Sequence, residues 1–210
     1  MARGMLYNNY PKKKYLLHVA VFLQTIIQAL SPSLYAQNLD IVATIKPIHS
    51  LVSMVIGDGK LESPTLLVKG TSSPHSYGLK ASDAKILNSA KIIFCVSDNF
   101  EPYLNKILYS LPANVKIISL AKTPGLQLLK FRRERDFEKE HPHKIENRSI
   151  PTIEDQSEFD GHIWLDPDNA ILLLKEINKI LKEFYPENAS AFEENTVQGI
   201  SDIQKTRLYV

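Results

Sequence analysis

Apolar and polar residues follow a pattern that predicts alternating strands and helices between residues 39 and 120. Short apolar runs rich in β-branched residues predict four strands, at residues 40–45, 65–68, 91–96 and 115–119. Helical spacing or a capping residue predicts helices between them, at residues 48–56, from Ser82-Asp83 to Leu87, and at 101–109. Strands separated by short helices are typical of a parallel sheet covered on both sides. The sequence therefore predicts an α/β fold, an open four-stranded, mainly parallel sheet with helices on both faces.

A long amphipathic helix is predicted after residue 165. Asp166-Pro167 marks its start, because Asp is a favoured N-cap and Pro suits the first helical position. One apolar stripe follows at helical spacing: Ala170, Leu173, Leu174, Ile177, Ile180, Leu181 and Phe184. A second, more polar helix is predicted from Glu187 to near Val210. Cys95 lies inside the apolar strand at 91–96, so we expect it to be an unreactive core residue.

The regular pattern stops between residues 130 and 160, where 16 of 31 residues are charged. Such a segment cannot form a core, so we predict a mobile surface loop. The loop contains His141 and His143. A His-x-His pair can bind transition metals weakly, and the alternative is that both residues are simply part of a solvated charged loop.

The first 36 residues have the order of a secretory signal peptide. Lys12, Lys13 and Lys14 precede an uncharged, mostly apolar stretch at 15–30, and Ala36 offers a small residue for cleavage. We expect export to the periplasm with cleavage near residue 36, and no stable membrane insertion afterwards. The alternative is an uncleaved anchor, although the stretch is short for a span of about 20 residues.

Charge and residue usage exclude several classes of function. The first 36 residues hold four of the 25 basic residues and no acid, so 21 basic and 23 acidic residues remain. The remainder therefore lacks the basic surface expected of a nucleic-acid-binding protein. A single cysteine excludes an internal disulfide and a cysteine-rich zinc module. The chain has no GxSxG, HExxH or Gly-rich phosphate motif, so we do not expect an enzyme.

Two histidines occupy loops where a ligand would bind in this fold. His75 lies in a turn-rich loop after the second predicted strand, and His162 lies just before the start of the long helix. Ligands of open parallel sheets bind beyond the carboxyl ends of the strands, and imidazole is a good zinc ligand. The two histidines can therefore converge on one metal ion. The alternative is that both are solvent-exposed or structural.

His49 is a weaker candidate at the start of the first predicted helix. It follows Lys46-Pro47-Ile48, close to the end of the first strand, and can approach the same cleft. The alternative is that it only packs or forms a hydrogen bond there.

Three segments, Ile45–Val52, Leu66–Asp83 and His162–Asn169, carry a resemblance to a known family. The second contains a Ser-Pro-His-x-Tyr loop followed by a Ser-Asp helix start, and the third reads HIWLDPDN. From about residue 39 onward the chain resembles the periplasmic zinc-uptake substrate-binding proteins. These belong to family 9 (cluster A) of the solute-binding proteins of metal ABC transporters.

The resemblance implies two α/β lobes joined by a long helix, with the metal held between them. It makes His75 and His162 the two ligands of the N-terminal lobe, and assigns His141 and His143 to a loop typical of zinc-type members. Some members have an acidic ligand just before the first histidine, where this chain has Pro74.

The resemblance also implies a domain organisation. We expect a signal peptide at 1–36, the metal-binding lobe at 37–185 and the start of the linking helix at 186–210, without the C-terminal lobe.

The function expected is that of an exported component of a high-affinity zinc ABC uptake system. It would capture Zn²⁺ for delivery to a permease and its ATPase. Zinc is favoured over Mn²⁺ because nitrogen ligands suit zinc, whereas manganese favours oxygen. Two alternatives stay open: a non-functional fragment, or a single-lobe metal carrier or adhesin-like protein that completes its site by dimerising.

Overall fold

The computed structural model describes residues 39–58, 61–70, 72–130 and 159–207. Its strands are β1 (Ile41–Ala43), β2 (Thr65–Leu66), β3 (Ile92–Cys95) and β4 (Lys116–Ser119). They form one sheet in the order β2-β1-β3-β4, and all three pairings are parallel. The predicted four-stranded parallel sheet is thus confirmed.

The two central strands form the middle of the core. Every residue of β1 and β3 is buried, as expected for strands covered on both faces. Cys95 is 2% exposed, which confirms its predicted place in the core, and burial raises the pKa of its thiol. β2 is shorter than predicted, but the amides of Leu67 and Val68 still donate to the carbonyls of Ala43, the last residue of β1, and of Thr44, which follows it.

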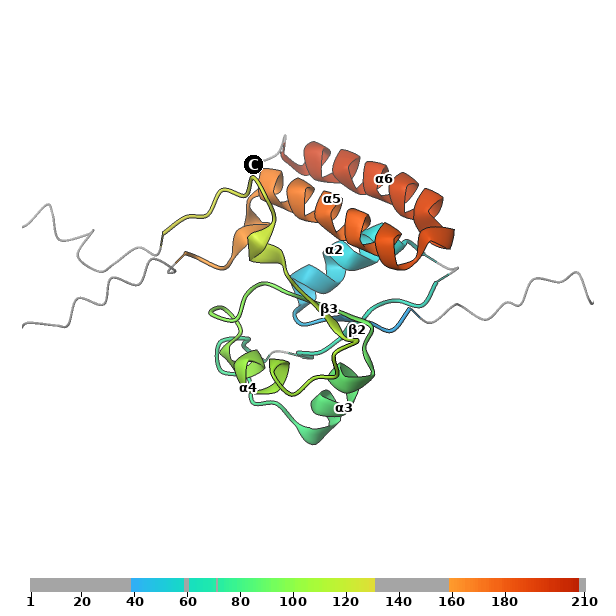
Figure 1. The fold of residues 1–210 in the computed structure, drawn as a ribbon. Helices are drawn as coiled ribbons and strands as arrows, with labels where there is room; N and C mark the ends of the chain where they lie inside the picture. The colour runs from blue at the N-terminus through green and yellow to red at the C-terminus, as the bar shows by residue number, and fades with distance from the viewer. Residues whose placement is uncertain (1–38, 59–60, 71, 131–158, 208–210) are drawn as a thin grey trace, which may run out of the picture. The chain divides into compact units, whose positions relative to one another are not determined.

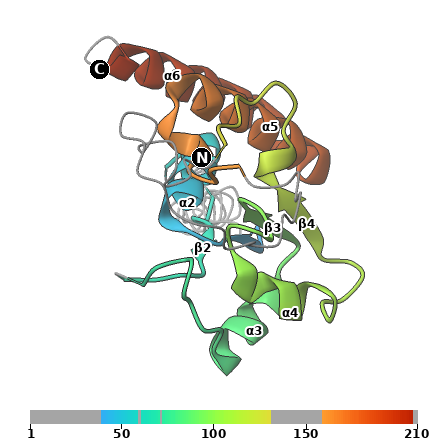
Figure 2. The ribbon, with the colours of Figure 1, turned by 90° about the vertical axis from the view of Figure 1, so that its left-hand side faces the viewer.

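Helices cover the sheet on both faces, as Figures 1 and 2 show. On one face lie α2 (Lys46–Ile56), α5 (Pro167–Phe184) and α6 (Ala189–Arg207), which contact one another. On the other lie α3 (Ala81–Ser89) and the short α4 (Asn105–Leu108). Four 3-10 turns complete the described elements: Pro102–Leu104, Leu120–Lys122, Ile163–Leu165 and Pro186–Asn188.

The predicted start and buried face of α5 are confirmed. The Asp166 carboxylate accepts hydrogen bonds from the amides of Asp168 and Asn169, and Pro167 is the first helical residue. The stripe turns inward from Ala170 to Leu181, and four of its side chains are fully buried: Leu173, Leu174, Ile177 and Leu181.

Several helices differ from their predicted bounds: α2 begins at Lys46 rather than residue 48, and α6 begins at Ala189 after a 3-10 turn. α3 begins at Ala81, one residue early, because Asp83 acts from inside the helix: its carboxylate accepts hydrogen bonds from the Lys80 amide and the Tyr77 hydroxyl. The segment predicted as one helix at 101–109 is a 3-10 turn followed by the single turn of α4.

Side chains of α6 fasten this helix to α2 and α5. The Asn195 amide donates to the carbonyls of Val55 and Ile56, at 3.1 Å each, and so caps the end of α2. Gly57 follows with a φ of 76°, and a Cβ there would lie 2.3 Å from Asn195 Nδ2, so both backbone and space require glycine. In the described residues, no helix combines the length and apolar character needed to cross a membrane.

Candidate metal centre

The two loop histidines meet at one depression beside the carboxyl ends of the strands. His75 comes from the loop after β2, and His162 from the residues just before α5. With Phe100 and Trp164 they line a cavity of about 340 Å³, which we call the histidine hollow; Lys46-Pro47 of α2 forms part of its wall. Residues 87 positions apart in sequence thus meet where the parallel sheet predicts a ligand site.

The distance between the two imidazoles suits a shared ion. Their ring centroids are 5.7 Å apart, with the ring planes inclined by 58°. Because a zinc–nitrogen bond measures about 2.0–2.1 Å, a single ion between the rings can reach a nitrogen of each. Both histidines are exposed, so an ion can reach them from solvent.

Phe100 packs against both histidines from below the surface. Its ring centroid lies 4.6 Å from that of His75 and 5.1 Å from that of His162, with edge-to-face geometry in both cases. Trp164 extends the aromatic group, with its ring 5.3 Å from His162 and 5.6 Å from Phe100. Phe100 is only 5% exposed, so it forms a buried support that limits how both imidazoles can turn.

A buried carboxylate holds the turn that carries Phe100. Glu101 is fully buried and accepts hydrogen bonds from the Val96 amide at 2.6 Å and the Tyr103 hydroxyl at 3.0 Å. Burial raises the pKa of the Glu101 carboxyl, although these hydrogen bonds act in the opposite direction. The turn after β3 is therefore fixed from inside the core, and Phe100 with it.

Gly161 lets His162 approach this support. A Cβ at Gly161 would lie 2.1 Å from Cδ2 of Phe100, far inside van der Waals contact. Any side chain at position 161 would therefore require Phe100 or the backbone to shift.

A carboxylate contacts His162 on the side of Nδ1. Asp160 Oδ1 lies 2.6 Å from that nitrogen and accepts a second hydrogen bond, at 3.0 Å, from the His162 amide. The amide and ring hydrogen bonds of His162 hold the pKa of the Asp160 carboxyl below its usual value. At His75 the polar contact is longer: the backbone amide donates to Ser73 Oγ at 3.3 Å.

The third candidate, His49, lies away from the histidine hollow. His49 is on α2, where its Nε2 lies 2.9 Å from the Pro64 carbonyl oxygen, and it borders a separate depression with Ser53 and Asp58. Its ring thus forms a hydrogen bond away from the histidine hollow. His141 and His143 fall outside the described residues. Pro74 lines the hollow but has no side-chain donor atom.

Two supporting residues of the centre, Phe100 and Glu101, were not among the residues singled out from the sequence. A signal for Phe100 was present, because it follows the buried strand β3 at the same edge where the histidines were expected. Glu101 has no comparable signal, since an isolated acid after a strand reads as a surface residue.

The described residues bring two candidate ligands together rather than a complete metal site. Across the ranges that the structure describes, no three His, Cys, Asp or Glu side chains gather closely enough to hold an ion. Zinc in proteins takes four ligands, or three and a water molecule. His75 and His162 therefore fit as half of such a site, and their chemistry suits zinc, which imidazole binds well.

Comparisons with known proteins identify the family of this chain. Residues 41–209 match the family described as "Zinc-uptake complex component A periplasmic". The high-affinity zinc uptake system protein ZnuA of Brucella abortus (strain 2308) is 35% identical over 185 residues, covering 78% of this chain and 54% of the relative. The corresponding protein of Yersinia pestis is 31% identical over 163 residues, covering 74% and 49%.

Solved structures share the fold. The Zn(II)-bound ZnuA-like domain of Streptococcus pneumoniae AdcA matches with a TM-score of 0.60 and 26% identity, covering 81% of this chain and 53% of that one. A Mn-bound periplasmic metal binding protein from Candidatus Liberibacter asiaticus matches with a TM-score of 0.62 at 23% identity, covering 82% and 55%. At that identity the likeness concerns the fold alone.

The match covers most of this chain but only part of its relatives. The chain spans about half the length of the curated relatives it matches. The family match extends over every described strand and helix, including both histidine loops. This chain belongs to the family of the periplasmic component A of zinc-uptake complexes.

Proposed function

We propose that this chain captures Zn²⁺ through the neutral imidazoles of His75 and His162, as the zinc-binding part of an ABC uptake system. The observation that carries the proposal is the pair of ring centroids 5.7 Å apart over one hollow. The names of the relatives, zinc uptake proteins and a zinc-bound domain, support the same cargo. The role is binding rather than catalysis, with delivery to a permease and its ATPase.

Zinc is the preferred cargo on chemical grounds. Two imidazole nitrogens favour zinc over Mn²⁺, which favours carboxylate and carbonyl oxygen. Only the neutral imidazole coordinates a metal, so binding releases protons when the histidines start charged and weakens in acid.

The remaining coordination positions need further donors. Two histidines leave two positions of a tetrahedral site, which water, a second copy of the chain or residues outside the described ranges can supply. If a second copy supplies them, zinc shifts the chain from monomer to dimer in sizing chromatography, and His75→Ala abolishes that shift.

The setting we propose is the periplasm. Lys12–Lys14 and the apolar stretch at 15–30 support a signal peptide over residues 1–36, and the family match begins at residue 41, just after it. Residues 37–185 would then form the metal-binding lobe, and 186–210 the start of a linking helix. N-terminal sequencing of the exported protein tests this cleavage, and an N-terminus still at Met1 would contradict it.

A competition titration with a chromophoric zinc chelator tests the function. We expect the parent to bind one zinc ion per chain, and His75→Ala and His162→Ala each to weaken binding more than about 100-fold. That loss exceeds the roughly 10–100-fold typical of residues that only support a ligand. His49→Ala should keep the parent affinity, because His49 lies away from the hollow. Unchanged affinity in both hollow variants would contradict the proposal.

A further inference from the structure

The contact between Asp160 and His162 determines which ring nitrogen is free. An ionised carboxylate has lone pairs and no proton, so it can only accept hydrogen bonds. Asp160 Oδ1 lies 2.6 Å from Nδ1 of His162, and Nδ1 must therefore carry the proton of the neutral ring. The other nitrogen, Nε2, then has a free lone pair.

We propose that Asp160 is a positioning residue that holds His162 as the Nδ1–H tautomer and so presents Nε2 to the metal. This inference rests on the proposed zinc function. Carboxylates and carbonyls that accept from the second nitrogen of a metal-bound histidine fix its orientation and raise its basicity as a ligand. Asp160 would perform that task before any metal arrives.

The carboxylate is itself held in place by the backbone around it. Oδ1 of Asp160 accepts from both the amide and the ring of His162, which ties the two residues into one unit. The Asp160 amide donates to the Leu129 carbonyl at 2.7 Å, next to a bridge between Lys130 and Phe159. Gly161, between them, lies directly against Phe100. Chain, ring and carboxylate therefore have little freedom to separate.

The contact is partly exposed, which limits its strength. The side chains of His162 and Asp160 are 42% and 44% exposed, so solvent screens their attraction. We therefore expect a loss at the lower end of the range for such supporting residues, about tenfold in zinc affinity.

The rival role for Asp160 is direct coordination of the metal. The two roles respond differently to the amide side chain of Asn. An Asn oxygen can still accept the hydrogen bond from Nδ1, whereas a neutral amide is a poor replacement for a carboxylate ligand. Asp160→Asn therefore separates positioning from ligation, and Asp160→Ala removes both.

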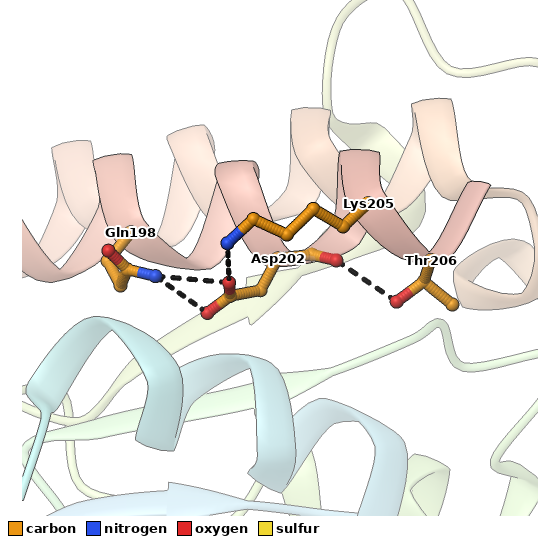
Figure 3. Close-up of polar contacts among 4 residues, drawn as sticks. All are labelled: Gln198, Asp202, Lys205 and Thr206. Carbon is orange, nitrogen blue, oxygen red and sulfur yellow. Dashed lines mark hydrogen bonds and ion pairs between the residues drawn. The ribbon is translucent and has the colours of Figure 1, made fainter. Parts of the chain in front are cut away.

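Asp202 offers a matched control carboxylate on a different element. Figure 3 shows it on α6, where it accepts from the Gln198 amide at 3.0 Å and from the Lys205 ammonium at 2.9 Å. Its side chain is 50% exposed, close to the value for Asp160, and its partners Gln198, Lys205 and Thr206 all lie on α6. Asp202→Asn therefore changes the same charge at similar exposure without touching a histidine.

The experiment records long-range ¹⁵N–¹H correlation spectra of the ¹⁵N-labelled chain without metal at about pH 8.5, where free histidine is neutral. We expect the proton of His162 on Nδ1 in the parent, in Asp160→Asn and in Asp202→Asn. Asp160→Ala should move a large share of the proton to Nε2. Zinc titration of the same samples should give about a tenfold loss for Asp160→Ala, a smaller loss for Asp160→Asn and none for Asp202→Asn.

Three results would overturn the proposal. They are a proton on Nε2 of His162 in the parent, an unchanged spectrum in Asp160→Ala, or an affinity loss as large in Asp160→Asn as in Asp160→Ala. The spectra need no metal, so they test the inference even if the parent binds no zinc. Failure of the proposed function and failure of this inference are thus separable.

Discussion

The two histidines of the hollow are held in different ways. His162 has a carboxylate on its ring, a buried glycine before it and the capped start of α5 just after it. His75 lies in an exposed loop, and its own contacts are a 3.3 Å hydrogen bond from its amide to Ser73, the edge-to-face contact with Phe100 and the ring contact with His162. His162 is therefore fixed by several contacts with the core, whereas His75 is held mainly by its contact with the Phe100 ring.

This difference gives the two loops different roles: His162 is a preformed ligand, and His75 is the more adaptable one. A ligand fixed in advance costs little ordering when the metal binds, and a more adaptable partner can adjust to the ion. The same difference makes the two loops respond unequally to substitution.

The largest effect should come from the packing of α5, which continues from His162. Leu173 is fully buried in this helix, so Leu173→Ala should lower the free energy of unfolding by about 2–5 kcal/mol. Urea unfolding measures this loss. Val197→Ala on α6, at a side chain 61% exposed, should stay within about 0.5 kcal/mol. Equal losses in the two variants would show that the helix layer is not packed as described.

The next effect compares the two loops directly through their glycines. Gly161→Ala places a methyl group against Phe100 and should cost about 1–3 kcal/mol in unfolding free energy. Gly78→Ala, in the loop of His75, meets no atom within 4 Å and should be nearly neutral. Thermal unfolding of both variants measures the contrast. A neutral Gly161→Ala would mean that His162 is not held against Phe100.

A smaller effect is expected at the cap of α5. Asp166→Ala removes the acceptor for two helix amides and should lower the free energy of unfolding by about 1 kcal/mol. Ser73→Ala, which removes the one long hydrogen bond at His75, should cost less. Chemical denaturation of both variants measures the two losses. A larger loss in Ser73→Ala would mean that the loop of His75, and not that of His162, is the more firmly anchored.

The smallest effect is a pH dependence of stability that arises from Glu101, which is buried in the turn that carries Phe100. Burial raises the pKa of Glu101 in the folded chain, so its protonated form is favoured by folding. The stability that this group lends is present below its unfolded pKa and is lost as pH rises through the folded pKa. The free energy of unfolding should therefore fall over this interval in the parent, and fall less in Glu101→Gln. Identical pH profiles would contradict a raised pKa.

Local patterns in the sequence predicted much of this fold. The strands, the Asp166 cap and the stripe of α5 depend on neighbouring residues, and each was confirmed. The start of α3 was misplaced by one residue because the Asp83 carboxylate caps from inside the helix.

The candidate site was predictable only in part. The rule that parallel strands place ligands at their carboxyl ends led to both His75 and His162. It also admitted His49, which the structure instead places beside the Pro64 carbonyl. The supporting residues could not be predicted. Phe100 contacts His75 and His162, which are 25 and 62 positions away, and Gly161 matters only because it lies against Phe100. Such long-range contacts leave no periodic signal in one sequence.

The central claim is that His75 and His162 hold one zinc ion together. Competition titration of the double variant, His75→Ala with His162→Ala, tests this most directly beside the two single variants. If the histidines share an ion, either substitution disables the site, and the double variant should bind hardly more weakly than the singles. Losses that simply add in the double variant would show two independent weak ligands and contradict the claim.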